Sequence, residues 1–285
     1  MKVSAIIPVG SAEMWPRCRQ SIEASIAHCG KADEFEVVPC MDLERRGVST
    51  ARNEGLARAT GEWIAWVDCD DEVAPTWCDT IMREIEGIGD EDIDVICFGA
   101  AMARADGESA TVRYCDERRD VASMRYLYDI LCDVGGSTWL WNKVFRRSLF
   151  DGLRFEGETQ EDFRIMPRVL MRTGRVRTIP DVIYRYMRPS GSLTHAGGGA
   201  RNANGILAAI SDGLSDVPRA ETIMPFWNEG SAVRAADCIY NSGRNRELMA
   251  FLRRNLRSIV FDPRLGMSVK AKSILAAFGA SRARR

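Results

Sequence analysis

The sequence of 285 residues lacks several features that mark common protein classes. Its nine cysteines are scattered, with no Cys-x-x-Cys pair, and it has only two histidines. A disulfide framework or a zinc site is therefore not expected, and the cysteines should be reduced thiols of a cytoplasmic protein. No apolar run reaches 18 residues, so we expect no transmembrane helix. We also expect no signal peptide, because residues 1–9 lead directly into a strand.

An excess of charge of one sign is missing as well. The 39 basic and 40 acidic residues leave a formal net charge of −1, which argues against wholesale nucleic-acid binding. There is no internal repeat and no low-complexity tract. A glycine-rich, basic phosphate loop is also absent after the first strand, where the chain reads Gly10-Ser-Ala-Glu-Met. A nucleotidyltransferase would need such a loop, so that class of enzyme is disfavoured.

What the sequence does have is an acidic motif directly after an apolar run. Residues 63–67 are the apolar Trp-Ile-Ala-Trp-Val, typical of a buried strand, and Asp68, Asp70 and Asp71 follow. Because side chains at i and i+2 of an extended chain face the same side, Asp68 and Asp70 should converge. Convergent carboxylates are suited to Mg²⁺ or Mn²⁺. The alternative is an acidic turn that caps the helix expected near Pro75.

Strands and helices alternate along the first half of the chain. We expect strands at residues 3–9, 35–38, 63–67 and 95–101, helices at 12–28 and 75–85, and a further helix opened by residues 47–56. This alternation predicts an α/β fold with a mostly parallel central sheet flanked by helices. Further on we expect a helix at 121–132, a helix at 162–173, and two strands, 176–179 and 182–187, separated by Pro180. Gly197-Gly-Gly is the best boundary, giving a catalytic domain at 1–196 and a C-terminal helical region at 197–285.

Several segments in this order resemble family 2 glycosyltransferases of the GT-A fold, and bacterial enzymes that build capsular polysaccharide or exopolysaccharide in particular. They are Ala5-Ile-Ile-Pro-Val, Gly47-Val-Ser-Thr-Ala-Arg-Asn-Glu-Gly-Leu, Gly61-Glu-Trp-Ile-Ala-Trp-Val-Asp-Cys-Asp-Asp, Trp141-Asn-Lys-Val-Phe-Arg-Arg-Ser-Leu-Phe, Glu161-Asp162 and Tyr184-Arg-Tyr-Met-Arg-Pro-Ser-Gly-Ser-Leu-Thr-His. The resemblance implies a nucleotide-sugar donor, a glycan or lipid-linked acceptor, Mn²⁺ or Mg²⁺ at the acidic motif, and inversion at the anomeric carbon.

The resemblance also implies roles for individual residues. Asp70 is expected to bind the metal, Asp68 the metal or the donor ribose, and Asp162 to act as the general base. His195 is either a third metal ligand or an ordinary loop histidine. An acidic first helical turn is the alternative for Asp162. The residues expected at the nucleotide-sugar site are Pro8, Val9, Asp42, Arg52, Asn53, Asp68, Lys143 and Glu161.

Some of these positions have a plain structural alternative. Arg52 and Asn53 either line the base pocket or anchor the start of a helix, and Lys143 either reaches a phosphate or is solvated. We interpret Trp141 as core and not as a sugar platform. Ser49 or Thr50 is the expected N-cap of the helix after Gly47.

The chain departs from the family at the base-recognition segment. Where the family has Val-Asp-Asp-Gly-Ser, this chain has Val38-Pro-Cys-Met-Asp-Leu, so only Asp42 is left to replace the acids. This departure leaves open an unusual donor, looser base selection, or a non-catalytic homologue that binds a nucleotide sugar or a glycan.

The C-terminal end has two interpretations. Basic side chains surround the apolar residues 274–278 and form either an amphipathic helix on an anionic membrane at the inner face of the cell, or a docked helix with a solvated tail. The basic residues are Lys270, Lys272, Arg282, Arg284 and Arg285. Association into a homo-oligomer is left open.

Overall fold

The structure, a computed structural model, describes residues 2–42, 44–103, 109–112, 116–132, 136–187, 199–217 and 219–281. They form two compact units, which we describe separately. Unit 1 comprises Met1–Ser123, Trp139–Glu156 and Arg172–Ser190, and unit 2 comprises Met124–Thr138, Gly157–Met171 and Gly191–Arg285. The boundary expected at residues 196–197 stays a prediction, and residues 197 and 198 lie outside the described residues.

Unit 1 is built on a nine-stranded mixed sheet with the order β2-β1-β3-β8-β5-β9-β4, to which β6 and β7 add at β5 and β9. The strands are β1 (Val3–Val9), β2 (Phe35–Met41), β3 (Trp63–Trp66), β4 (Glu72–Val73), β5 (Ile93–Ala103), β6 (Ser109–Val112), β7 (Arg119–Ala122), β8 (Lys143–Arg146) and β9 (Arg175–Tyr186). The α/β class is confirmed. The first three strands are parallel as expected, but β8 is antiparallel to both β3 and β5, so the sheet is mixed rather than mostly parallel.

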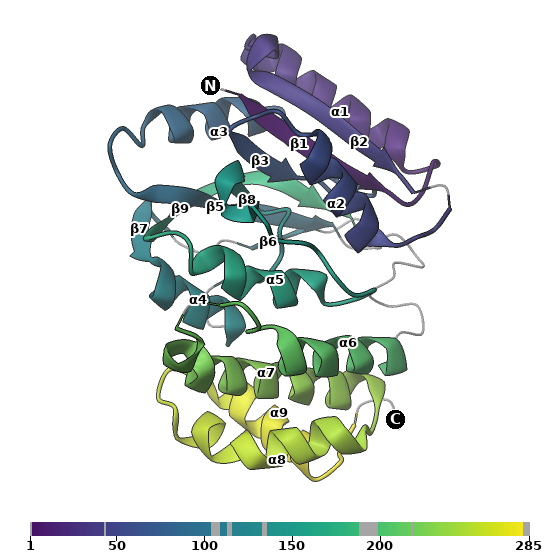
Figure 1. Cartoon of the computed structure of the whole chain (residues 1–285), viewed down its shortest axis with the longest axis vertical. Coiled ribbons are helices and arrows are strands. Elements are labelled where there is room, and N and C mark those ends of the chain that lie inside the picture. The colour runs from purple at the N-terminus through teal and green to yellow at the C-terminus, as the bar shows by residue number, and fades with distance from the viewer. Residues whose placement is uncertain are drawn as a thin grey trace. The chain divides into compact units, whose positions relative to one another are not determined.

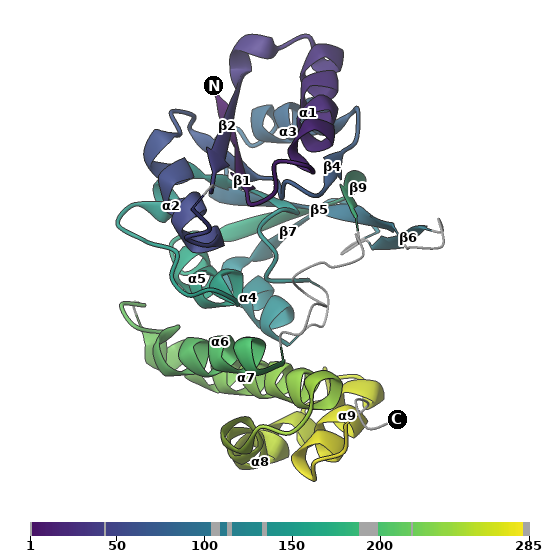
Figure 2. The ribbon, with the colours of Figure 1, turned by 90° about the vertical axis from the view of Figure 1, so that its right-hand side faces the viewer.

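Helices cover both faces of the first strands, as Figures 1 and 2 show. Helices α1 (Trp15–Cys29) and α3 (Trp77–Glu86) lie on one face, where they pack on Val3, Ala5 and Ile7 of β1. Helix α2 (Val48–Arg58) covers the other face, where Gly55 lies so close to Ile6 that a Cβ atom would come within 2.2 Å of it. The alternation of side chains along a buried strand thus supplies both layers.

Three expected elements need correction. Residues 119–122 form strand β7, paired with β9, so the helix expected at 121–132 begins only at Ser123. The two strands expected around Pro180 are one strand, because shifts of register near Gly99 let β9 accommodate the proline. Helix α2 has Gly47 as its N-cap, with φ 99°, and neither Ser49 nor Thr50 caps it. A cap at Gly47 exploits the positive φ that glycine adopts without strain.

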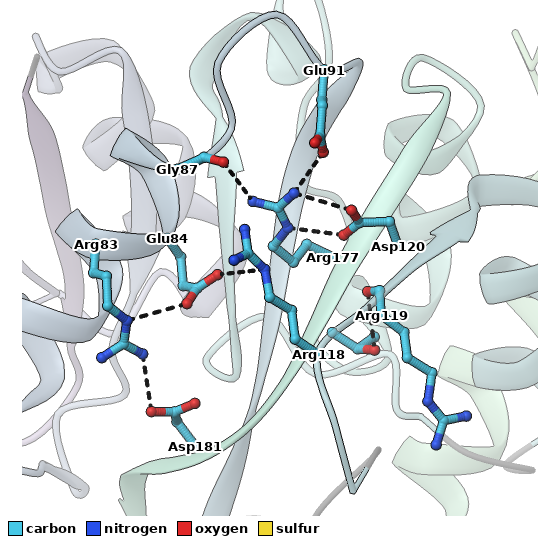
Figure 3. A network of polar contacts seen from close by, with 10 residues as sticks. Arg83, Glu84, Gly87, Glu91, Arg118, Arg119, Asp120, Arg177 and Asp181 are labelled. Carbon is cyan, nitrogen blue, oxygen red and sulfur yellow. Dashed lines mark hydrogen bonds and ion pairs between the residues drawn. The ribbon is translucent and has the colours of Figure 1, made fainter.

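A buried arginine joins β7, β9 and the end of α3 (Figure 3). The Arg177 guanidinium donates from Nε and Nη2 to both carboxylate oxygens of Asp120, at 2.8 and 3.0 Å. It also donates to Glu91 at 2.6 Å and to the Gly87 carbonyl at 3.3 Å. A guanidinium that is 2% exposed is tolerated here because its planar fork is matched by these acceptors.

Unit 2 is helical. Helix α5 (Glu161–Leu170) contacts α6 (Gly199–Asp212), and α6 packs on α7 (Ala220–Ser242), which also contacts α8 (Arg246–Phe261) and α9 (Met267–Ala277). Tyr128 and Cys132, from helix α4 (Ser123–Leu131) and the turn after it, belong to the same apolar core. The expected helical character of the C-terminal region is confirmed for the described residues, where α6, α7, α8 and α9 follow one another. None of the helices in the described ranges is long and apolar enough to cross a bilayer.

Candidate active site

The acidic motif forms a turn at the end of β3. The Asp71 amide donates to the Asp68 carbonyl at 3.0 Å, so the chain turns there. We had expected the chain to leave the sheet in an extended conformation, and this expectation is wrong. The acids do not cap α3 either, because that helix starts at Trp77 with Thr76 as N-cap and no side-chain cap. The interpretation as an acidic cap of α3 is therefore wrong.

Asp71 is the structural member of the turn. Its side chain is buried, and its two oxygens accept from the Tyr184 hydroxyl at 2.9 Å and the Met187 amide at 2.7 Å. Burial, followed by the charge of Asp68, raises the pKa of Asp71 to about 9. Both oxygens of this acid are therefore used within the fold, by β9 and by the residue that follows it.

Asp68 is the more accessible acid, with 29% of its side chain exposed. Its Oδ1 lies 3.4 Å from the Nη2 atom of Arg52, a buried arginine of α2. The guanidinium also lies over the rings of Trp66 and Phe155, with 5.9 and 5.6 Å to the ring centroids. The structure thus brings together Asp68 and Arg52, two of the residues expected at the nucleotide-sugar site.

Asp70 lies at the middle of the turn and is partly buried. Burial raises the pKa of its carboxyl group, and the charge of Arg17 opposes this rise. Within the described ranges, no three His, Cys, Asp or Glu side chains are grouped closely enough to hold a metal ion. The donor set nevertheless fits, because Mg²⁺ takes one or two protein carboxylates and completes its shell with water and phosphate oxygens. His195, the third expected ligand, lies outside the described residues.

The ends of β1 and β2 carry the other residues expected to bind the nucleotide. Pro8 and Val9 are buried at the end of β1, opposite Cys40 and Met41 of β2. Asp42 accepts from the Arg46 and Gly47 amides with its two oxygens, both at 2.7 Å. Asp42 thus closes the loop that leads into α2, and backbone amides of that loop occupy both of its carboxylate oxygens.

Asn53 and Lys143 also make contacts within the protein. The Asn53 amide group exchanges two hydrogen bonds with the backbone of Phe155, at 2.9 and 2.8 Å, which supports its role as an anchor. Lys143 is fully buried, so the expectation of a solvated lysine is wrong. Its Nζ atom donates to the Trp139 carbonyl at 2.6 Å and to Asn142 Oδ1 at 2.7 Å.

Asp162 and Glu161 form the first turn of α5 in unit 2. Asp162 Oδ1 accepts from the Phe163 amide at 2.6 Å, and its Oδ2 lies 3.5 Å from the Thr138 hydroxyl. Arg234 of α7 donates to the same Thr138 hydroxyl at 2.9 Å and to Gln160 at 3.1 Å. Asp162 therefore belongs to a group of polar side chains in unit 2 that includes the positively charged Arg234.

A cavity of about 730 Å³ opens beside α2 in unit 1, away from the acidic turn. Of the residues expected at the site it includes only Asn53, and Arg46, Arg147 and Arg154 contribute to its wall. We therefore build the candidate active site on the acidic turn, where the charged side chains converge.

Sequence reasoning missed one organising residue in each unit. Tyr184 is fully buried and binds the acidic turn from β9, and Arg234 holds Thr138 beside Asp162. Tyr184 belongs to a segment that carried the family resemblance, which was the only signal available. Arg234 sits in a helix with no such signal, more than seventy residues from its partners in the chain.

The chain is similar to glycosyltransferases in two comparisons, with a protein-family model and with curated proteins. Residues 25–153 match the protein-family model described as glycosyl transferase family 2. The putative glycosyltransferase EpsH of Bacillus subtilis is 32% identical over 111 residues, which are 39% of this chain and 31% of EpsH. Glycosyltransferase GlyG of Streptococcus pneumoniae is 24% identical over 180 residues, which are 60% of this chain and 58% of GlyG. The chain thus spans about a third to somewhat over half of the length of these curated relatives.

Solved structures show the fold. A crystal structure of S. aureus TarS 1-349 in complex with UDP-GlcNAc has a TM-score of 0.61 and 16% identity, covering 97% of this chain and 89% of that chain. A second crystal structure of S. aureus TarS 1-349 has a TM-score of 0.56 and 15% identity. The expected GT-A fold is confirmed by this likeness.

Proposed function

Since residues 25–153 of the chain belong to glycosyltransferase family 2, we propose that the protein is an inverting, metal-dependent glycosyltransferase acting on a nucleotide-sugar donor. The observation that carries the proposal is the acidic turn at the end of β3, where Asp68 and Asp70 follow a buried strand and Asp71 is locked by β9. Ligands of open α/β sheets bind outside the carboxyl ends of the strands, which is where this turn lies.

In this proposal Asp68 and Asp70 would hold Mn²⁺ or Mg²⁺. Such a cation would act as a Lewis acid on the diphosphate leaving group, whose charge grows as the glycosidic bond breaks. Arg52, 3.4 Å from Asp68, adds a fixed positive charge on the same side of the turn. The anionic groups of the donor are thus met by charges that the fold has already positioned.

Asp162 would act as the general base. It accepts the proton of the acceptor hydroxyl while that oxygen attacks the anomeric carbon and the diphosphate leaves from the opposite face. The anomeric carbon passes through an oxocarbenium-like state, and its configuration is inverted in a single displacement. The contact of Asp162 with Thr138, which Arg234 holds at 2.9 Å, supports a fixed orientation of the carboxylate.

The acceptor in this proposal is a glycan or a lipid-linked sugar in surface polysaccharide synthesis, at the inner face of the cell membrane. An apolar stripe on α9 and its C-cap residue supports contact with a membrane: Met267, Ile274, Leu275 and the C-cap Phe278 are 78%, 39%, 48% and 76% exposed. Lys270 lies on the same helix. An exposed apolar stripe with adjoining basic charge is the surface that an anionic bilayer binds. Arg282, Arg284 and Arg285, which were expected to add to it, lie outside the described residues.

One observation favours a second candidate, a homologue that binds a nucleotide sugar or glycan without turnover. Both oxygens of Asp42, the only acid in the base-recognition segment, are occupied by backbone amides. The two candidates differ in one assay. The protein is incubated with UDP- and GDP-sugars, Mn²⁺ and a bacterial lipid extract, and nucleoside diphosphate and glycosylated product are followed. Product of inverted configuration supports the transferase, and binding without product supports the homologue.

A further inference from the structure

Four aromatic side chains stack in nearly parallel planes beside the acidic turn. The Trp141 ring lies 4.6 Å from that of Tyr184 and 4.8 Å from that of Trp139, with interplanar angles of 18° and 19°. Tyr186 adds a fourth ring, 5.6 Å from Trp141 at 22° and parallel to Trp139 within 4°. Such a run of stacked rings is an ordered arrangement, because each pair satisfies the offset geometry that aromatic quadrupoles prefer.

The stack runs from the core of unit 1 to its surface. Tyr184 and Trp141 are buried, whereas Trp139 and Tyr186 are partly exposed at the edge of the same apolar cluster. The inner end is tied to the acidic turn, because the Tyr184 hydroxyl bonds Asp71 and accepts from the Asp68 amide. The two outer rings are therefore connected to the acidic turn through the rings of Trp141 and Tyr184.

A buried lysine, Lys143, holds the backbone of Trp139 in place. Lys143 Nζ donates to the Trp139 carbonyl, and the neighbouring Asn142 donates to the Phe98 carbonyl at 3.4 Å. Burying a lysine costs desolvation free energy, which these hydrogen bonds offset. The backbone of Trp139 is thereby fixed to strands β5 and β8, while the residue as a whole remains partly exposed.

The order of the strands places the stack relative to the nucleotide side of the turn. Strand β8 runs antiparallel beside β3, with Ala65 opposite Val144, so the residues before Lys143 lie alongside those that follow Trp66. Pro8, Val9 and Asp42, at the ends of β1 and β2, lie on the other side of β3. A donor whose base is at β1 and β2 would leave the β8 side of the acidic turn to the acceptor.

We propose that Trp139 and Tyr186 form a stacking platform for a pyranose ring of a carbohydrate acceptor. The assignment of this ring to the acceptor rests on the proposed function. The C–H face of a pyranose is apolar and packs on an aromatic face, while the hydroxyl groups around its edge keep their water. Two outer rings that are parallel within 4° offer such a face, and the buried pair behind them holds it in place.

The test is saturation-transfer NMR on the full chain with methyl β-glucoside, methyl β-galactoside and methyl β-N-acetylglucosaminide. Saturating the aromatic protons should transfer magnetisation to the C–H protons of at least one of these sugars. Trp139→Leu keeps an apolar side chain without a ring and should weaken that sugar about tenfold, whereas Trp139→Phe keeps a ring and should weaken it less than about threefold. Both variants are compared with wild type by thermal unfolding, which should change by a similar amount in each.

Absence of transfer to all three sugars, or equal transfer in wild type and Trp139→Leu, would overturn the platform. A parallel titration with UDP- and GDP-sugars in Mn²⁺ separates the two proposals. If a nucleotide sugar binds and the ring makes no difference to the pyranosides, the platform alone fails. If the ring-dependent transfer is seen and no nucleotide sugar binds, the platform stands as a glycan site and the proposed function fails.

Discussion

The Tyr184 hydroxyl donates a hydrogen bond of 2.9 Å to Asp71, and the two residues, 113 positions apart in the chain, are 0% and 1% exposed. The same hydroxyl accepts from the Asp68 amide at 3.1 Å. One oxygen atom on β9 thus binds both ends of the acidic turn on β3. The direction in which Asp68 and Asp70 point therefore depends on a strand that the sequence places far from them.

Tyr184→Phe should destabilise the protein by about 1–3 kcal/mol, because it leaves a buried oxygen of the Asp71 carboxyl group and a backbone amide without their partner. Urea unfolding measures the loss. A double-mutant cycle with Asp71→Asn should give a coupling free energy of about 1 kcal/mol or more, since the two side chains contact each other. Additive effects of the two substitutions would mean that the hydrogen bond contributes nothing to the turn.

Asp162→Asn should leave donor affinity unchanged and lower turnover by about 10²–10⁴-fold, because only proton transfer from the acceptor is removed. Asp216→Asn is the matched control, because it makes the same change of side chain at an exposed position of unit 2 that is not among the residues expected at the site. Steady-state kinetics with the acceptor identified from a lipid extract, together with donor calorimetry, makes the comparison. Wild-type turnover in Asp162→Asn would assign the base to another residue.

Arg177→Met should cost about 2–3 kcal/mol of unfolding free energy at pH 7, because Asp120 and the Gly87 carbonyl lose a buried donor (Figure 3). Arg83→Met is the control in the same network. Its side chain is 57% exposed beside Asp181, so its loss should cost less than about 1 kcal/mol. Chemical unfolding at constant salt measures both variants, and equal costs would contradict the role given to burial.

The contact between Arg177 and Asp120 also predicts how the free energy of unfolding depends on pH. Hydrogen bonding to Arg177 lowers the pKa of Asp120, so its stabilisation is present above the ordinary carboxyl pKa of about 3.9 and is lost as the pH falls through the lowered value. The difference between wild type and Arg177→Met should therefore be constant between about pH 5 and pH 7 and shrink below about pH 4. A difference that grows on acidification would contradict this sign.

The stripe on α9 predicts binding to anionic vesicles. Replacing Met267, Leu275 and Phe278 together by serine should abolish co-sedimentation with phosphatidylglycerol vesicles at low salt, since it removes the most exposed apolar groups of the helix. These substitutions leave α9 in place, together with its buried residues Ser273, Ala276 and Ala277. Met224→Ser, 40% exposed on α7, is the control. Equal sedimentation of the triple variant and wild type would remove α9 from the membrane proposal.

Local pattern was enough to predict much of unit 1. The apolar runs at β1 and β3 and the acids that follow β3 gave the parallel strands and the place of the acidic turn, because burial and turn chemistry act within a few residues. The failures are non-local. Strand β8 was not expected and is antiparallel to β3, and residues 119–122 form a strand because they pair with β9.

The same limit applies to the candidate site. The acids Asp68 and Asp70 follow from the sequence, but their support by Tyr184 and Arg52 depends on strand order and helix packing. Lys143 is the clearest case. A lysine in a mixed sequence is expected at the surface, and its burial becomes intelligible only when the Trp139 carbonyl and Asn142 are found around it.

The most direct test of the central claim is calorimetric titration of UDP- and GDP-sugars into wild type and Asp70→Asn, in Mn²⁺ and in EDTA. Asp70→Asn keeps the shape of the side chain and removes half of the carboxylate pair that would hold a hard cation. Asp90→Asn, at an exposed position of unit 1, is the matched control. We predict that at least one nucleotide sugar binds wild type and Asp90→Asn in Mn²⁺, and that this binding is lost in EDTA and in Asp70→Asn, with unchanged thermal unfolding. Binding of equal affinity in Asp70→Asn, or in wild type without the metal, would contradict a metal-dependent donor site at the acidic turn.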